Sequence, residues 1–372
     1  MKNLLKKLIA TAPTHENGEL QTAQVLENYF HDHGISAALD RWDDNRANLV
    51  ATIGPETPET PILVIGVHID VVPASEEMWG CDPFEAIEKN GKIYGRGSCD
   101  MQGGICAAAA AIVEMAQSGI ELNGRIIFAA TAGEETDSCG VKRFIETYRD
   151  KISNPIGILI PEPTGLEILR AHRGILWLKI ETEGKTAHGS MPHLGINAIE
   201  KMNAFLNRLK DYKILHKPHA LLGNCSMSIN RIAGGTGTNI VPDRCSVELD
   251  IRTLPGQGPD DIISNLRDIC EELKKDDREF KADISIIRAV DAMETNENDP
   301  FLKAVCTATG IHETKAAGFT TDGPYFKKLN APVLIFGPGD GTLCHKPNEY
   351  IKIAQMEKAK AYYKKLITEV LA

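Results

Sequence analysis

The chain has 372 residues, about two and a half times the roughly 150 residues of one typical domain, which excludes a single small module and predicts two domains or one domain with an insertion. Hydrophobic residues make up 42% and charged residues 25%, a balance that excludes a disordered or fibrous chain. The formal net charge is −10 and no basic run occurs, so we expect no nucleic-acid partner.

The first eleven residues have apolar side chains at helical spacing, but this stretch is too short and too interrupted for a signal-peptide core. The longest run of small apolar residues, 105–113, is far below the roughly 20 residues that span a bilayer. The nine cysteines are odd in number, scattered and without a Cys-x-x-Cys pair, as in a reducing compartment. We therefore expect a cytoplasmic protein without a membrane segment.

The first 170 residues alternate between helix-like and strand-like patterns. A helical stripe at 25–30 ends before Gly34, and the continuously apolar runs 61–67 and 125–130 are typical of strands buried on both faces of a parallel sheet. The Ala-rich stretch 103–113 between them predicts a helix that packs closely on that sheet, and 157–160 predicts a third strand. This order predicts an α/β fold with a doubly wound, mostly parallel sheet.

The pattern changes from about residue 175. Alternating or helical spacing predicts, in order, a strand at 176–181, a helix at 196–209, strands at 227–232 and 247–251, a helix at 259–275 and a strand at 283–290. This β-α-β-β-α-β order is ferredoxin-like. Because parallel-strand character returns at 331–337 and an amphipathic helix begins at Ile353, we predict one domain of residues 1–174 and 290–372 with an inserted α+β domain, 175–289.

Polar side chains stand where each predicted parallel strand ends, or in the loop before the Ala-rich helix: His68, Asp70, Asp100, Glu134, Glu135, Glu162 and His345. Because ligands of open α/β sheets bind at the carboxyl ends of the strands, we expect these groups to converge. Two imidazoles and four or five carboxylates suit zinc, and the number of carboxylates is sufficient for two ions that share a bridge. Each pattern alone is a common surface feature, and their joint placement carries the inference.

Seven motifs occur in order along the chain: GVHIDVVP (66–73), GRGSCDMQGG (95–104), GEE (133–135), PEPT (161–164), TAHGS (186–190), DIRTLPG (250–256) and CHKP (344–347). Through these motifs, essentially the whole chain resembles the di-zinc metallopeptidase family that includes aminoacylase, acetylornithine deacetylase, succinyl-diaminopimelate desuccinylase and the glutamate carboxypeptidases.

For the metal ions, the resemblance implies two Zn²⁺, with Co²⁺ or Mn²⁺ as possible substitutes, bridged by Asp100, with His68 and Glu162 completing one site and Glu135 and His345 the other. It makes Glu134 the general base, which takes a proton from water and passes it to the leaving amine. It also implies that Asp70 orients His68, and that the Asp100–Met101 peptide bond is cis.

The resemblance further implies that the insert is a lid and dimerisation domain, so we expect a homodimer in which His188 steadies the oxyanion in the partner subunit's site. Arg252 lies on the polar face of its strand and could bind the substrate α-carboxylate, although an ion pair with Glu248 or Asp250 explains it equally well. Asn239 is a candidate donor to the substrate or its oxyanion.

Stretches around 162–174, 250–256 and 337–350 resemble acetylornithine deacetylase more than the desuccinylase. They predict a hydrolase that removes an N-acyl group from a small amino acid, with N-acetylornithine as the first candidate and arginine biosynthesis as its setting. The alternatives are a desuccinylase, dipeptidase, aminoacylase or carboxypeptidase that acts on a small molecule or short peptide. A metal-free binding protein with the same fold is the alternative from another class, but such relatives typically lose ligands.

Overall fold

The computed structural model describes residues 1–372, except for the side chain of Glu76. Contacts within the chain divide it into two compact units. The first consists of Met1–Arg170, Glu294–Ala316 and Thr321–Ala372, and the second of Ala171–Met293 and Ala317–Thr320. The predicted insert, 175–289, falls inside the second unit. In the part of the chain that is described, no helix is both long and apolar enough to cross a bilayer.

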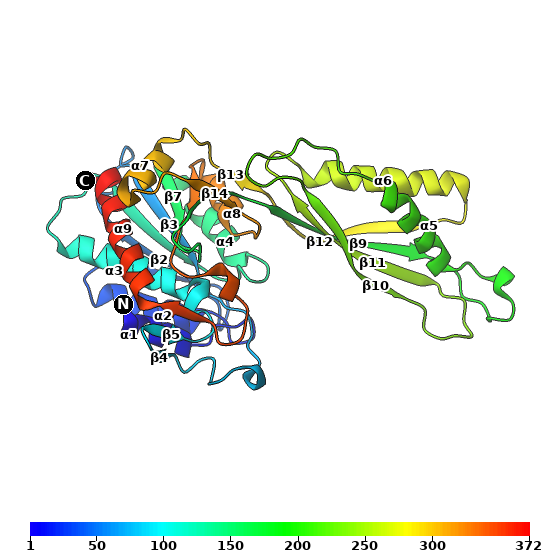
Figure 1. The fold of residues 1–372 in the computed structure, drawn as a ribbon, viewed down its shortest axis with the longest axis horizontal. Coiled ribbons are helices and arrows are strands. Elements are labelled where there is room, and N and C mark those ends of the chain that lie inside the picture. Colours follow the sequence, from blue (N-terminus) through cyan, green and yellow to red (C-terminus); the bar gives the residue numbers. More distant parts are fainter. The chain divides into compact units, whose positions relative to one another are not determined.

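A large twisted sheet forms the centre of the first unit (Figure 1). Its strands, in spatial order, are β1 (Ser36–Arg41), β2 (Ala47–Ile53), β6 (Arg125–Thr131), β3 (Ile62–His68), β7 (Pro155–Ile160), β15 (Val333–Ile335), β8 (Ile168–His172) and β13 (Met293–Glu294), with β14 (Thr314–Ala317) paired to β8. The central strands β6, β3, β7 and β15 are parallel, and antiparallel pairs flank them. All residues of β3 are buried, which explains its continuously apolar sequence.

Helices pack on both faces of this sheet. Phe128 of β6 contacts Phe30, whereas Gly66 of β3 lies so close to the ring of Phe326 that a Cβ would be 2.5 Å from it. Phe128 is paired with Ile65, the neighbour of Gly66, so Phe128 and Gly66 face opposite sides. The helices of this unit are α1 (Lys2–Ala10), α2 (Leu20–His31), α3 (Gly103–Gln117), α4 (Cys139–Tyr148), α7 (Pro300–Thr309), α8 (Gly323–Phe326) and α9 (Ile353–Leu371).

The Ala-rich helix α3 packs closely against its surroundings, as the sequence predicted. Its residues from Gly103 to Val113 are buried, and it contacts α9 and β3. A Cβ on Gly104 would lie 2.1 Å from the carbonyl oxygen of Pro161. The start of α3 therefore lies directly against the loop that follows β7.

A small second sheet was not predicted. It pairs β16 (Tyr350–Lys352) with β5 (Lys92–Tyr94), and β5 with β4 (Ile87–Lys89), all antiparallel. The pairing brings together two segments far apart in the sequence. It places the residues just before β16 beside the glycine-rich loop that follows β5.

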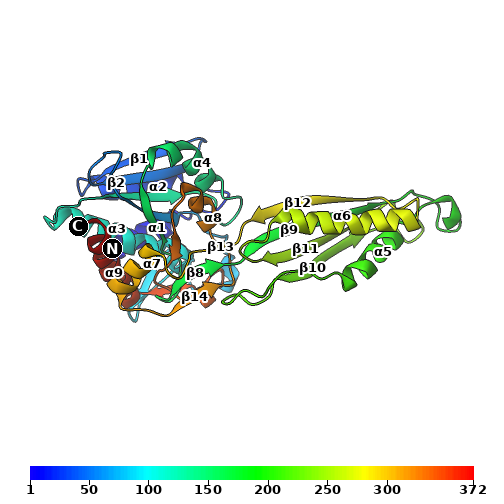
Figure 2. The same ribbon diagram turned by 90° about the horizontal axis from the view of Figure 1, so that it is seen from above.

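The second unit has the predicted ferredoxin-like order. Its elements are β9 (Gly174–Glu183), α5 (Ala198–Asp211), β10 (Ser226–Gly234), β11 (Arg244–Thr253), α6 (Pro259–Asp276) and β12 (Ala282–Val290). The strands pair antiparallel in the order β10-β11-β9-β12, and Figure 2 shows α5 and α6 on one face of the sheet. Alternate residues of β9 and β11 point into a core with both helices, which explains their period-two patterns.

Candidate metal centre

Five predicted ligands lie around the carboxyl-terminal ends of the parallel strands in the first unit. His68 is the last residue of β3, Glu135 follows β6 and Glu162 follows β7. Asp100 lies in the turn before α3, and His345 follows β15. Parallel strands bring their carboxyl ends to the same edge of the sheet, so loops distant in sequence meet there.

Asp100 lies between two imidazoles, and each of its oxygens contacts a different one. Oδ1 is 3.2 Å from Nε2 of His68, and Oδ2 is 3.3 Å from Nε2 of His345. Oε1 of Glu162 lies 3.4 Å from the same nitrogen of His68, and Oε1 of Glu135 lies 3.0 Å from that of His345. The side chains thus form two sets, each with one imidazole and one glutamate, that share Asp100.

This donor set has the chemistry of a site for divalent cations. Ligand atoms of His68, Asp100 and Glu135 all lie within 4.8 Å of one another. Imidazole nitrogens and carboxylate oxygens together suit Zn²⁺ and similar borderline cations. The residues present therefore fit a metal, and the sharing of Asp100 fits a pair of metals better than a single one.

In the metal-free chain, contacts between the imidazoles and Asp100 shift the pKa values of His345 and Asp100 in opposite directions. Hydrogen bonds to Asp100 and Glu135 raise the pKa of His345 to about 10. Although burial opposes ionisation of Asp100, the hydrogen bonds from His345 and His68 hold its pKa well below the usual range. Burial raises the pKa of Glu162 to about 7. A bound cation would take the place of the protons, because metal ligands must be deprotonated.

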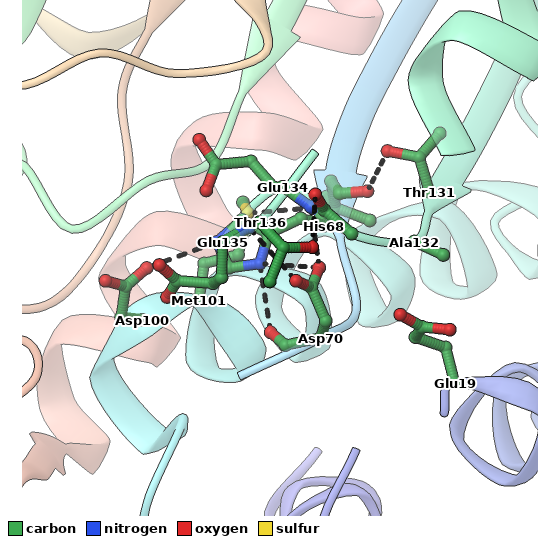
Figure 3. Close-up of polar contacts among 12 residues, drawn as sticks. Glu19, His68, Asp70, Asp100, Met101, Thr131, Ala132, Glu134, Glu135 and Thr136 are labelled. Atoms are coloured by element: carbon green, nitrogen blue, oxygen red, sulfur yellow. Dashed lines mark hydrogen bonds and ion pairs between the residues drawn. The ribbon is translucent and has the colours of Figure 1, made fainter. Parts of the chain in front are cut away.

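Glu134 is the neighbour of Glu135 in the sequence, but its side chain takes another direction (Figure 3). In Figure 3 the carboxylate of Glu135 lies beside Asp100, while the side chain of Glu134 points in a different direction. Burial raises the pKa of Glu134 well above its usual value, His68 opposes this rise, and Asp322 and Glu135 add to it. A glutamate carboxylate is one of the side chains that act as general bases, and a raised pKa makes it a stronger base.

Asp70 holds the loop that carries the two glutamates. Its Oδ1 and Oδ2 accept hydrogen bonds from the backbone amides of Glu134 and Glu135, each at 3.0 Å (Figure 3). Nδ1 of His68 lies 3.1 Å from the backbone oxygen of Asp70 and 3.6 Å from its carboxylate. A proton on Nδ1 leaves Nε2 free to bind a cation. The orientation of His68 by Asp70 stays a prediction. The hydrogen bonds from the amides of Glu134 and Glu135 to Asp70 are contacts that the sequence did not predict.

The structure brings two of the three candidate residues of the insert together. The amide of Gly189 donates to the backbone oxygen of Asn239 at 2.7 Å, and His188 forms a β-bridge with Ile240. Arg252 instead makes a two-pronged pair with Asp250, at 2.8 and 3.0 Å, which is one of the ion pairs considered as an alternative. All three belong to the second unit, and their part in the reaction stays a prediction.

Sequence analysis did not single out the buried charged residues Arg96, Asp322 and Glu349. Glu349 lies in a stretch that carried the resemblance, but its contacts depend on the unpredicted pairing of β16 with β5. The Asp100–Met101 peptide bond is cis, as predicted.

Comparison with known proteins identifies the family of the chain. The sequence model of peptidase family M20/M25/M40 matches residues 64–369. A Staphylococcus aureus (strain MRSA252) protein named probable succinyl-diaminopimelate desuccinylase is 31% identical over 385 residues, covering 92% of this chain and 91% of its own. Acetylornithine deacetylase of Myxococcus xanthus is 27% identical over 370 residues, covering 97% of this chain and 95% of its own.

Solved structures share the fold. Aminopeptidase PepT from Bacillus cereus superposes with a TM-score of 0.80 at 21% identity, covering 99% of this chain and 97% of its own. A protein of Bacillus subtilis described as a dinuclear metal-binding peptidase has a TM-score of 0.73 at 17% identity, covering 100% and 99%. The predicted fold class and family resemblance are confirmed. The chain belongs to peptidase family M20/M25/M40, a metal-dependent family, and is a hydrolase of amide bonds.

Proposed function

We propose that the protein is a two-metal amidohydrolase that removes an N-acyl group from a small amino acid. The observation that carries the two-metal part of this proposal is the position of Asp100, whose two oxygens contact the imidazoles of His68 and His345 separately. Each imidazole also contacts its own glutamate, so the two sets are alike. A site for one cation would need only one such set.

Two Zn²⁺ ions, with Co²⁺ or Mn²⁺ as substitutes, would be held by the residues of the two sets. One would be held by His68, Glu162 and Asp100, and the other by Asp100, Glu135 and His345. Cations bound there polarise an amide carbonyl and lower the pKa of water.

The chain's own residues supply the proton transfers. Glu134 accepts a proton from the attacking water and returns it to the leaving amine, for which its raised pKa is suited. Asp70 keeps this base in place through the amides of residues 134 and 135. In the insert, His188 and Asn239 are the proposed donors to the oxyanion, with His188 acting in the partner subunit's site.

Two acyl substrates are in contention. The local stretches that resemble acetylornithine deacetylase favour N-acetylornithine. The identity to proteins named probable succinyl-diaminopimelate desuccinylase, 30–31% against 27% for the acetylornithine deacetylase, favours a succinyl substrate. Both carry a free α-carboxylate and a linear amide, so the same metal chemistry acts on either.

A competition assay with the metal-reconstituted protein separates these substrates. The mixture contains N-acetylornithine, N-acetylmethionine, N-succinyl-diaminopimelate and a simple dipeptide. We expect N-acetylornithine to be hydrolysed first. A preference of about tenfold, or roughly 1.4 kcal/mol, for another member reassigns the substrate and leaves the amidohydrolase intact. Hydrolysis of none of them by metal-loaded protein contradicts the proposal itself.

Arg252 is the proposed partner of the substrate α-carboxylate. Asp250 accepts hydrogen bonds from Nε and Nη2 of the Arg252 guanidinium. Because the side chain of Arg252 is partly exposed, the remaining N–H donors can bind a second carboxylate. Arg252→Ala should lower kcat/KM for a substrate with a free carboxylate, by an amount that corresponds to about 2–4 kcal/mol of lost transition-state stabilisation. The loss should be much smaller for the methyl ester of that substrate. The matched variant Asp250→Asn keeps the guanidinium. If Arg252 serves only its ion pair with Asp250, both variants will change the thermal stability. The change in kcat/KM will then be the same for the free acid and for its methyl ester.

A further inference from the structure

A buried carboxylate outside the ligand sets lies beside the loop that carries Asp100. Glu349 is 1% exposed and directly precedes β16, close behind His345 in the sequence. The pairing of β16 with β5 places Glu349 opposite Gly95, whose amide donates to the backbone oxygen of Glu349 at 3.0 Å. The loop from Gly95 to Asp100 therefore begins beside Glu349.

Both carboxylate oxygens of Glu349 are bound by this loop. Oε1 accepts from the amides of Cys99 and Asp100, at 2.8 and 3.1 Å. Oε2 accepts from Nη1 of Arg96 at 2.6 Å and from the amide of Gly97 at 3.2 Å. A carboxylate that accepts from a guanidinium and several amides has its charge balanced and its position fixed. The backbone that leads into Asp100 is fixed with it.

We propose that Glu349 is a positioning residue of the metal centre. Its carboxylate sets Asp100 between the two cation sites and ties it to the segment that carries His345. An ion pair that only stabilised the fold would need Arg96 alone, whereas Glu349 also binds the amide of Asp100 itself. The inference rests on the proposed two-metal site. A wrong role of Glu349 and a wrong number of metal ions give different results in the experiments that follow.

The substitution Glu349→Gln removes this role with little change of shape. Glutamine has one acceptor oxygen, and its NH₂ group would face donors at the other position. Either the amides of Cys99 and Asp100 or the donors of Arg96 and Gly97 then lose their acceptor while buried. Glu349→Asp keeps both oxygens on a shorter stem and should partly restore function.

Cobalt binding to the full chain measures the effect. The protein is stripped with a chelator and titrated with Co²⁺ in competition with a chelating dye, and the visible spectrum of bound Co²⁺ is recorded. We expect Glu349→Gln to weaken the affinity by about 10–100-fold, the usual effect of losing a partner that orients a ligand, and to alter the spectrum. Wild-type affinity and spectrum in this variant would overturn the inference.

Glu19→Gln is the matched control. Glu19 is as buried as Glu349, and its carboxylate also binds an arginine, with Nε and Nη2 of Arg46 at 3.0 and 2.8 Å. It binds this guanidinium rather than the backbone of a ligand-bearing loop (Figure 3). This variant should lower the melting temperature of the metal-free chain but reduce the Co²⁺ affinity much less than Glu349→Gln does. An equal loss of Co²⁺ affinity in both variants would show a general effect of lost buried charge and overturn the inference.

Hydrogen exchange on the wild-type chain tests the inference without any variant. The amides of Gly97, Cys99 and Asp100 should be protected in the metal-free protein, because Glu349 holds them before a cation binds. Exchange as fast as in an unstructured peptide would overturn the inference. If the wild type binds one Co²⁺ and no second, the two-metal proposal fails, while the loss of affinity in Glu349→Gln still decides the role of Glu349.

Discussion

Adjacent residues of the same type lie in different environments at this site. Glu135 hydrogen-bonds His345 and lies beside Asp100, whereas the side chain of Glu134 points in a different direction. The backbone of both is fixed by Asp70, so their side chains cannot exchange places by a small rotation of the loop. The difference in environment predicts a difference in function.

Replacement of the two glutamates should therefore separate turnover from metal binding. Glu134→Ala should keep two cations and lose kcat by about two to four orders of magnitude, the usual contribution of a general base. Glu135→Ala should lose affinity for one cation by more than the roughly 10–100-fold caused by losing an outer partner. Elemental analysis and steady-state kinetics on both variants check this, and the reverse pattern would show that the roles are exchanged.

Metal binding should release protons, because His345 carries one in the metal-free chain at neutral pH. Its pKa there is raised from 6.5 to about 10. Protonated His345 therefore stabilises the metal-free fold fully below pH 6.5, and this contribution is lost as the pH rises through about 10. A cation must displace that proton, so the apparent affinity for Zn²⁺ should rise with pH across the same range.

Calorimetric titration in buffers of different ionisation enthalpy measures the protons released. His345→Ala should release fewer protons than the wild type, and the loss should concern the set that contains Glu135. Zn²⁺ affinity that is independent of pH between about 6 and 9 would show that His345 is already neutral in the metal-free chain.

At the scale of elements, close packing of α3 on the loop after β7 connects the fold to the metal centre. A Cβ on Gly104 would meet the carbonyl oxygen of Pro161 at 2.1 Å, and Glu162 is the next residue. The contact is with backbone, which cannot move aside as a flexible side chain does. The glycine is therefore required for the position of Glu162 as well as for packing.

Gly104→Ala should destabilise the chain by about 1–3 kcal/mol, as overpacking of a filled interior does. Thermal unfolding of the metal-free protein measures this loss, and Zn²⁺ titration should show weaker binding because Glu162 is displaced. Gly318→Ala is the control, since among the described residues nothing lies within 4 Å of its Cβ position and its φ is not positive. Equal melting temperatures for the two variants would mean that the loop after β7 adjusts without loss.

The elements predicted from the sequence are those whose pattern is local. The continuous apolar runs that became β3 and β6, and the alternating strands of the insert, record their burial directly in the residue order. The candidate ligands could be predicted because they follow such strands or, in the case of Asp100, precede the Ala-rich helix. The β1–β2 hairpin and the three-residue strands β4, β5 and β16 have too little periodicity to be seen. Glu349 was missed for that reason, because its partners lie about 250 positions away.

At the scale of the whole molecule, the chain carries its proposed metal ligands in one unit and three other proposed site residues in the second. His188, Asn239 and Arg252 all belong to the second unit, and their side chains are exposed or partly exposed. The resemblance predicts that the insert joins two subunits, so that His188 completes the site of the partner subunit. Such sharing would make the dimer, rather than the single chain, the active species.

Subunit exchange tests this prediction directly. Glu134→Ala and His188→Ala are each expected to be inactive as pure dimers, one lacking the base and the other the oxyanion donor. A mixed dimer has one site with both residues, because Glu134 of one chain meets His188 of the other. With equal amounts and complete exchange, half the dimers are mixed and half of their sites are intact, so activity should recover to about a quarter of the wild-type value. Mass spectrometry of differently tagged chains verifies the exchange. Inactivity of verified mixed dimers would place His188 in the site of its own chain or outside the reaction, and a monomeric wild type would exclude sharing altogether.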